Sequence, residues 1–309
     1  MALMVQVILP VAILVACGYL AARFRVLGEA AVDGLMLFSQ KFAIPCLLFA
    51  AIARLDLATQ FRGTLLASYY VGALCVFTLG FLGARFLFGR PWQDSVAIGF
   101  AAFFSNSVLL GLPVTERAYG ADALQANFAL ISINAPLCYC VGVTAMELLR
   151  FSGASSLVKL RAVLSAMFSN VLVVAIMCGF VVNLGAIPVP DTLWQVIDMA
   201  AAAALPVALF GLGGVLLRYR PEGDMATILF ICALSLLINP AIVWTMGQTL
   251  DLTTAQFRSA VITAAMAPGV NVYLFADFYG VGRRVAASSV LLGTVLSILS
   301  VWMWLSILP

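Results

Sequence analysis

Two short polar interruptions inside apolar segments carry the residues best suited to chemistry in this sequence. The first is Ser105-Asn106-Ser107, followed by Gly111 and Pro113, and the second is Pro268-Gly269, followed by Asn271. Amides and hydroxyls donate hydrogen bonds, proline removes a backbone donor, and glycine lets a chain leave helical geometry. If both segments break here, two helix N-termini with free N–H groups face one another. Such ends bind anions, typically a carboxylate.

A plainer interpretation is that Asn106 and Asn271 only hydrogen-bond helices together while the prolines bend them. Asn106 lies 12 residues after Asp94, and Asn271 lies 13 after Arg258. At about 1.5 Å per residue, both fall near the middle of an apolar layer roughly 30 Å thick. Two interrupted segments at matching places in two halves favour the substrate site of a secondary transporter over helix packing alone.

The composition requires a lipid environment for the segments that carry these residues. Of 309 residues, 64% are hydrophobic and 9% are charged, whereas roughly a quarter are charged in soluble proteins. The apolar runs have helix length, roughly 20 residues, rather than the roughly ten of barrel strands. We therefore predict an all-α polytopic membrane protein. Histidine is absent and the seven cysteines lie in apolar segments, so we expect neither a metal site nor a catalytic site, and no cofactor.

Apolar runs between charged or glycine- and proline-rich breaks predict ten transmembrane helices. Their approximate limits are 3–21, 35–53, 64–84, 95–115, 124–148, 163–184, 193–217, 226–249, 257–278 and 285–307. The longest polar link divides the chain into a first five-helix repeat at 1–150, a cytoplasmic linker at 151–162 and a second five-helix repeat at 163–309.

The two halves resemble one another. The run AIPCLLF at 43–49 resembles ALPVALF at 204–210, which is 161 residues later, and similar offsets relate Ser95 to Ser259 and Asn106 to Asn271. Because five is odd, the second half enters the membrane from the opposite side, which makes the repeat inverted.

Lysine and arginine placement predicts the orientation. Eleven basic residues lie in one set of loops and four in the other. The positive-inside rule makes the first set cytoplasmic, so both termini are expected to be extracytoplasmic in a multi-pass protein of the plasma or inner membrane. The net charge of +3 contains no basic run that would suit nucleic acid.

These features together resemble the auxin efflux carrier family, which includes plant auxin exporters and bacterial malonate or malate carriers. The resemblance rests on ten predicted spans, Asn106 with Gly111 and Pro113, Pro268 with Asn271, and the proline-containing second and seventh spans. Two features differ from the plant proteins. Ser105 stands where they have proline, and a short link replaces their long loop between the halves.

The resemblance implies a fold shared with bile-acid and sodium/proton carriers. Helices 1, 2, 6 and 7 would form a scaffold, often dimeric, and helices 3–5 and 8–10 a moving transport domain. The broken helices 4 and 9 would cross beside the substrate. Carried over by position, Asn106 and Asn271 line the site, and Asn134 falls where a polar residue of the fifth span contacts the carboxylate.

Other polar residues allow two interpretations each. Lys41 could neutralise the second charge of a dicarboxylate, or its long stem could reach the membrane interface. Ser105 and Ser107 could donate to a substrate oxygen or bond back to the preceding turn. Asp198 could bind a proton or sodium ion, or lie in the outer headgroup zone.

We therefore expect a secondary transporter, not an enzyme, for a small mono- or dicarboxylate of the malonate or malate type. The expected site residues are Lys41, Ser105, Asn106, Ser107, Gly111, Asn134, Pro268, Gly269 and Asn271. The expected partners are the anion, the lipid bilayer and a second copy of the chain, and the expected mechanism is of elevator type. The alternatives are a sodium- or proton-coupled symporter of bulkier hydrophobic anions and an anion channel, for which no filter sequence is visible.

Overall fold

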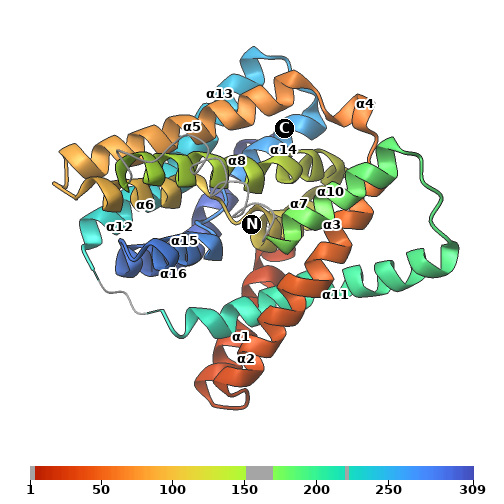
Figure 1. Cartoon of the computed structure of the whole chain (residues 1–309), viewed down its shortest axis with the longest axis horizontal. Helices are drawn as coiled ribbons and strands as arrows, with labels where there is room; N and C mark the ends of the chain where they lie inside the picture. Colours follow the sequence, from red (N-terminus) through yellow and green to blue (C-terminus); the bar gives the residue numbers. More distant parts are fainter. Residues whose placement is uncertain (1–3, 151–169, 220–222) are drawn as a thin grey trace.

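A computed structural model describes residues 4–150, 170–219 and 223–309 (Figure 1). Every regular element within these ranges is a helix, and one isolated antiparallel bridge pairs Ser105 with Pro268. The predicted all-helical class is therefore confirmed. The predicted linker 151–162 and the first residues of the predicted span 163–184 lie outside the described residues.

Seven helices in the described ranges are long and apolar enough to cross a membrane, and each overlaps one predicted span. Their bounds are Gln6–Arg23, Glu29–Ala53, Gly63–Phe86, Ala121–Leu149, Asp191–Leu216, Met225–Thr249 and Arg283–Ile307. The apolar helix α10 is shorter, at Val171–Leu184. The protein is thus a polytopic helical membrane protein. The ten-helix inverted repeat stays a prediction.

The two predicted spans with polar interruptions are each divided in two. The first consists of α6 (Trp92–Phe103), the π-helical turn η3 (Ser107–Gly111) and α7 (Leu112–Tyr119). The second consists of α14 (Thr254–Ala264) and α15 (Val270–Tyr279). The remaining helices are α1 (Leu9–Arg23), α2 (Glu29–Phe38), α3 (Ile44–Ala53), α4 (Leu57–Gln60), α5 (Gly63–Phe86), α8 (Leu124–Arg150), α11 (Asp191–Leu216), α12 (Met225–Ala233), α13 (Asn239–Thr249) and α16 (Arg283–Ile307).

Four π-helical turns occur in the described helices, and each precedes a proline at the same spacing. They are η1 (Met4–Ile8), η2 (Ser39–Ala43), η3 and η5 (Leu234–Ile238), followed by Pro10, Pro45, Pro113 and Pro240. Proline has no N–H, and its ring collides with the carbonyl four residues earlier. A wider turn before the proline relieves that collision, so the helix continues instead of stopping. Such turns are frequent at functional sites.

The helices pack into two groups (Figure 1). In the first group, α11 packs on α1, α2 and α3, and α3 packs on α10. In the second group, α5 packs on α6 and α13, α13 on α14, and α16 on α12 and α15. The α8 helix packs on α6 and α14 in the second group and also contacts α3 and α10. The divided spans therefore belong to the second group and lie beside the first.

Glycines set the close approach of α1 and α11 in the first group. A Cβ at Gly18 would collide with the Phe210 carbonyl, and a Cβ at Gly213 would collide with the Val15 carbonyl. Small residues at such positions allow van der Waals packing of backbones, which is a main source of helix association in lipid. The α1–α11 contact therefore depends on both glycines.

Phe100 joins the elements that surround the divided spans. Its ring is fully buried on α6 and stacks on Phe275 of α15, with ring centroids 4.0 Å apart. On α8, Gly142 leaves the space that the Phe100 ring fills, because a Cβ there would collide with it. One aromatic side chain thus fixes α6, α8 and α15 relative to one another.

Asp198 has a partner within the first group. Arg54 donates from both terminal nitrogens to the two Asp198 carboxylate oxygens at 2.8 and 2.9 Å, and its guanidinium lies 4.0 Å from the Trp194 ring centroid. Both charged side chains are about half exposed. The pair links the end of α3 to α11.

Candidate functional site

The breaks in the two divided spans meet and hydrogen-bond to one another. The Asn106 N–H donates to the Ala267 carbonyl at 2.7 Å, and the Gly269 N–H donates to the Phe104 carbonyl at 2.9 Å. This pairing satisfies backbone groups that lipid could not satisfy. We call residues 104–106 the first break and residues 265–269 the second break.

The first break falls at the predicted polar interruption, and only the further prediction that Gly111 and Pro113 open the helix after Asn106 is corrected. Phe104 leaves helical geometry with φ −83° and ψ 81°. The chain is helical again from Ser107, and the Asn106 carbonyl accepts from the Leu110 and Gly111 N–H groups, both at 3.1 Å. The π-helical turn η3 accommodates Pro113, so the helix runs on into α7.

The second break begins after Ala264 and ends at Gly269, as the proline and glycine there predict. Neighbouring side chains donate hydrogen bonds to carbonyls in and next to this break. Ser235 of η5 donates to the Met266 carbonyl at 3.1 Å, and the Asn239 amide of α13 donates to the Ala264 carbonyl at 3.2 Å. A segment rich in small and apolar residues can therefore stay extended in the membrane interior without unsatisfied carbonyls at these positions.

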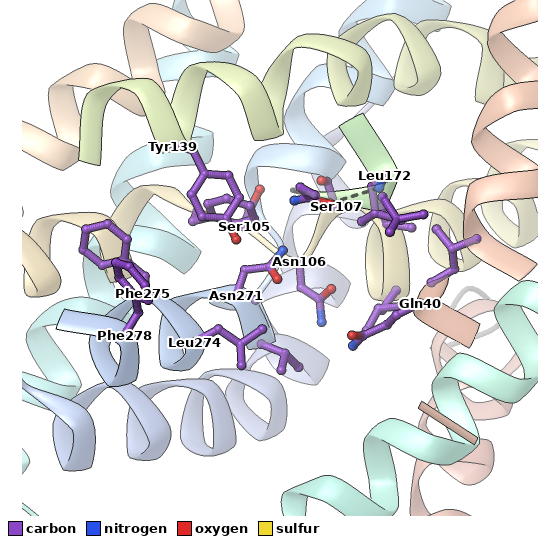
Figure 2. A pocket seen from close by; sticks show the side chains of 18 of the residues that line it. Gln40, Ser105, Asn106, Ser107, Tyr139, Leu172, Asn271, Leu274, Phe275 and Phe278 are labelled. Atoms are coloured by element: carbon purple, nitrogen blue, oxygen red, sulfur yellow. Dashed lines mark hydrogen bonds between the residues drawn. The ribbon is translucent and has the colours of Figure 1, made fainter. Parts of the chain in front are cut away.

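A cavity of about 560 Å³ lies against the meeting point of the breaks (Figure 2). Asn106 and Asn271 lie near its centre, with Gln40 on one side and Tyr139, Phe275 and Phe278 on the other. Six of the predicted site residues line it, namely Lys41, Ser105, Asn106, Ser107, Gly269 and Asn271. The turn η2 packs on α2, α3 and α11 of the first group, whereas both breaks belong to the second group. The cavity therefore lies between the two groups.

Asn106 is the most unusual polar group of this cavity. The residue is 6% exposed, and its side-chain Nδ2 has no hydrogen-bond partner among the described residues. A buried amide nitrogen without an acceptor costs about 1–3 kcal/mol. Around it, the first turns of η3 and α15 both border the cavity. Helix N-termini carry partial positive charge, so the polar environment of Asn106 favours an anion.

The two serines beside Asn106 differ in their contacts. Ser105 Oγ lies 3.1 Å from the Tyr69 hydroxyl, and either oxygen can donate. Both Ser105 and Ser107 are buried and line the cavity. Ser105 is thus tied to α5, which positions the first break.

Two side chains of opposite charge line the cavity. Lys41 is exposed and lies on η2, next to Gln40. Glu147 lies on α8 and accepts a hydrogen bond from the Tyr279 hydroxyl at 3.2 Å. The charges come from different groups of helices, Lys41 from the first and Glu147 from the second.

Three predicted site residues do not line the cavity. Pro268 pairs with Ser105 across the breaks, and Gly111 packs close to Met266. Asn134 is buried, and its Oδ1 accepts a weak hydrogen bond from the Cys138 thiol at 3.5 Å. The contact of Asn134 with a carboxylate therefore stays a prediction, one that this cavity does not require.

Sequence reasoning missed three features of the cavity. These are its wall of aromatic side chains, the amide of Gln40 and the carboxylate of Glu147. Phe104 and Tyr139 meet edge to face with centroids 5.6 Å apart, and Phe275 packs on Tyr279 at 4.9 Å. Aromatic residues are common throughout the apolar segments, so nothing in their spacing separates a cavity wall from a lipid-facing surface. For Gln40, the available signal was Pro45, because a proline inside a helix marks a local distortion.

Comparison with known proteins finds transporters that are similar over nearly the whole chain. The chain is 25% identical over 305 residues to the "Putative malonate transporter" of Rhizobium meliloti (strain 1021), covering 97% of this chain and 94% of the relative. It is 25% identical over 308 residues to an "Uncharacterized transporter" of Methanothermobacter thermautotrophicus, covering 97% and 96%. It is 22% identical over 304 residues to the "Uncharacterized transporter YfdV" of Escherichia coli (strain K12), covering 96% and 95%.

The match to a family model is equally extensive. Residues 3–305 match the model described as "Membrane transport protein", which includes both divided spans and the cavity between the two groups. The resemblance to the auxin efflux carriers is thereby confirmed. This chain belongs to the membrane transport protein family, the family of the auxin efflux carriers.

Proposed function

We propose that this protein is a secondary transporter of a small organic anion whose carboxylate binds where the two breaks meet. The observation that carries the proposal is the buried Asn106 side chain, which lines the cavity and whose Nδ2 has no hydrogen-bond acceptor among the described residues. A carboxylate oxygen supplies that acceptor. The first turns of η3 and α15 add N–H groups and the positive ends of helix dipoles.

A dicarboxylate of the malonate or malate type fits the charges of the cavity best. One carboxylate binds at Asn106 and Asn271, and the second lies toward Lys41 on η2. Glu147, on the wall of the second group, disfavours a second negative charge on its own side. The wording of the Rhizobium meliloti relative's name points to the same class of substrate.

The transport step follows from the position of the cavity between two groups of helices. In this proposal the first group is the scaffold, and the second group carries the substrate across the membrane by sliding past it. The first group also forms the homodimer contact. Both termini face the extracytoplasmic side of the cell membrane, in agreement with the distribution of lysine and arginine.

A second candidate substrate is a bulkier hydrophobic anion, with sodium or proton coupling. The aromatic wall formed by Phe104, Tyr139 and Phe275 favours it, because such a wall contacts an apolar body better than it contacts a hydrated dianion. In this case the carboxylate still binds at Asn106, and the apolar part lies along the aromatic rings.

Thermal unfolding tests the proposal. The melting temperature of the purified protein is measured with a panel of mono- and dicarboxylates, with and without sodium. A ligand that binds the folded state raises the melting temperature by mass action. We expect malonate or malate to raise it for the wild type and not for Asn106→Ala. A response only to hydrophobic anions supports the second candidate, and no response to any carboxylate contradicts both. Counterflow in vesicles then separates a carrier from a channel, because only a carrier exchanges labelled substrate against a gradient.

A further inference from the structure

A second cavity, of about 450 Å³, lies between α1 and α16. Its wall includes Leu110 of η3 and Met266 of the second break, whereas the neighbouring Leu109 and Gly269 line the first cavity. The meeting point of the breaks therefore separates the two cavities. The Asn106 cavity does not extend into this second space.

The chemistry of the second cavity is apolar. No charged side chain lines it among the described residues. Two of its three hydroxyl side chains lie on α16 and donate within their own helix, Thr294 to the Val290 carbonyl and Ser297 to the Thr294 carbonyl, both at 2.7 Å. The third belongs to Tyr19 of α1, which is partly exposed. A water molecule needs two to four polar partners in such a space, so an apolar occupant suits it better than water.

The mouth of this cavity lies between exposed side chains of two candidate membrane spans. Tyr19 and Leu20 of α1 and Val295 of α16 line it and are 38%, 47% and 55% exposed. Both helices belong to candidate membrane spans. The molecules that lie against exposed apolar side chains of a membrane span are the acyl chains of phospholipids.

We propose that one acyl chain of a bilayer phospholipid occupies this cavity and packs between α1 and α16. Transfer from one apolar environment to another brings little hydrophobic gain, so the binding depends on van der Waals contacts that an empty space would lose. The site is separate from the substrate cavity, and its existence does not depend on the proposed transport function.

Native mass spectrometry tests this site. The protein is first reconstituted with palmitoyl-oleoyl phosphatidylethanolamine and phosphatidylglycerol, and loosely bound lipid is then removed with detergent. Ala12→Trp fills the cavity from α1, and Val295→Trp fills it from α16. Ile13→Trp is the matched control, because Ile13 is on α1 and 51% exposed but does not line the cavity.

We expect the wild type and Ile13→Trp to retain one phospholipid per chain. Both cavity-filling variants are expected to retain at least tenfold less phospholipid. Size-exclusion profiles show whether each variant is folded, and Val295→Trp carries the test if Ala12→Trp is not. Equal retention by all variants, no retention by the wild type, or retention of free fatty acid or detergent alone would overturn the proposal.

Discussion

The two breaks have related positions but different contents. The first carries polar side chains, and the Asn106 side-chain nitrogen has no partner within the described chain. The second is apolar between Ala265 and Gly269, and Ser235 and Asn239 take up its carbonyls from a neighbouring span. The first break therefore keeps an amide donor without a partner among the described residues, whereas side chains of a neighbouring span donate to the Met266 carbonyl of the second break and to the Ala264 carbonyl just before it.

This difference indicates that the two breaks have different roles, one in binding a ligand and the other in positioning α15. Asn271, at the start of α15, is half-buried, whereas Asn106 is 6% exposed. A hydrogen bond at a buried site that excludes water is stronger than a hydrogen bond at a site that water reaches. We therefore assign the larger share of carboxylate binding to Asn106, and we assign to the second break mainly the task of holding α15 in place.

The largest effect is expected from Asn106→Ala. Loss of a hydrogen bond to a charged group costs about 1.5–3 kcal/mol, which corresponds to roughly 10- to 150-fold weaker binding. Asn271→Ala is expected to weaken binding less. Asn134→Ala tests the contact that the family resemblance implies, because Asn134 does not line the cavity and unchanged binding would exclude that contact. Isothermal titration with malonate measures all three. An Asn271 effect larger than the Asn106 effect would reverse the comparison of the breaks.

Ser235→Ala is expected to destabilise the fold rather than to weaken ligand contacts. It leaves the Met266 carbonyl of the second break without its donor, which costs about 1–3 kcal/mol in the free energy of unfolding. The control is Ser289→Ala, because Ser289 is equally buried but donates to the Ala286 carbonyl of its own helix. Denaturant unfolding in detergent compares them, and equal stabilities would show that the second break needs no support.

Lys41→Met is expected to act on dicarboxylates only. The ammonium is exposed, so its attraction for the second carboxylate contributes about 1 kcal/mol, or roughly a fivefold change in affinity. Lys41→Arg should keep most of that affinity. Titration with malonate and with acetate measures the selectivity, and an equal loss for both anions would place Lys41 at the first carboxylate instead.

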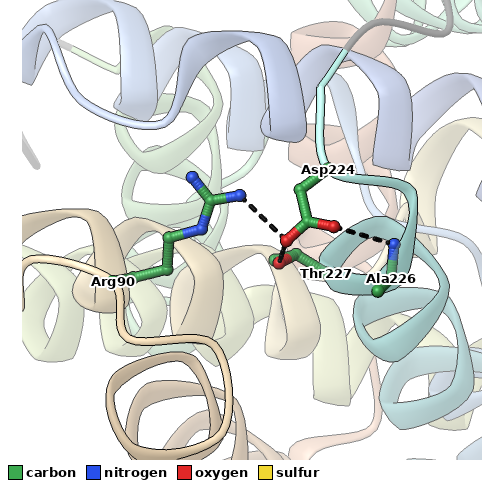
Figure 3. Close-up of polar contacts among 4 residues, drawn as sticks. All are labelled: Arg90, Asp224, Ala226 and Thr227. Carbon is green, nitrogen blue, oxygen red and sulfur yellow. Dashed lines mark hydrogen bonds and ion pairs between the residues drawn. The ribbon is translucent and has the colours of Figure 1, made fainter.

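The smallest expected effect concerns the ion pair between the segments that precede α6 and α12 (Figure 3). Asp224 precedes α12 and accepts hydrogen bonds from Thr227 at 2.6 Å and from Arg90, before α6, at 3.1 Å. The Thr227 hydroxyl first, and then Arg90 and the Ala226 N–H, lower the pKa of Asp224 below its ordinary value of 3.8.

A lowered pKa makes this contribution to stability pH-dependent. The charged carboxylate is favoured in the folded state, so its contribution is fully present above the ordinary carboxyl pKa and is lost as pH falls through the lower folded pKa. Melting temperatures measured from pH 6 downward should therefore fall slightly less steeply for Asp224→Asn than for the wild type. Identical slopes would mean that this link is energetically neutral.

The sequence predicted most of the helix limits and the existence of both breaks, because apolar length and the positions of proline and glycine determine them locally. The polar residues Ser105, Asn106 and Ser107 predicted the position of the first break correctly, but Gly111 and Pro113 do not open the helix, because the π-helical turn η3 accommodates the proline. The chain leaves helical geometry at Phe104 instead, because Asn106 hydrogen-bonds to Ala267, a contact that local sequence does not reveal.

The rotation of α8 was also beyond local sequence. Its residues are apolar on most sides, so no polar stripe identifies the face that meets the cavity. Asn134 and Tyr139 are five residues apart, which is about 140° around a helix. The structure places Tyr139 at the cavity and Asn134 in the surrounding packing. Composition therefore predicted the helix but not the face that lines the site.

The most direct test of the account is a structure of this protein with malonate bound. We expect one carboxylate within hydrogen-bond distance of Asn106 Nδ2 and of the first-turn N–H groups of α15, with the second carboxylate toward Lys41. A malonate bound away from both breaks, with Asn106 Nδ2 still lacking an acceptor, would contradict it.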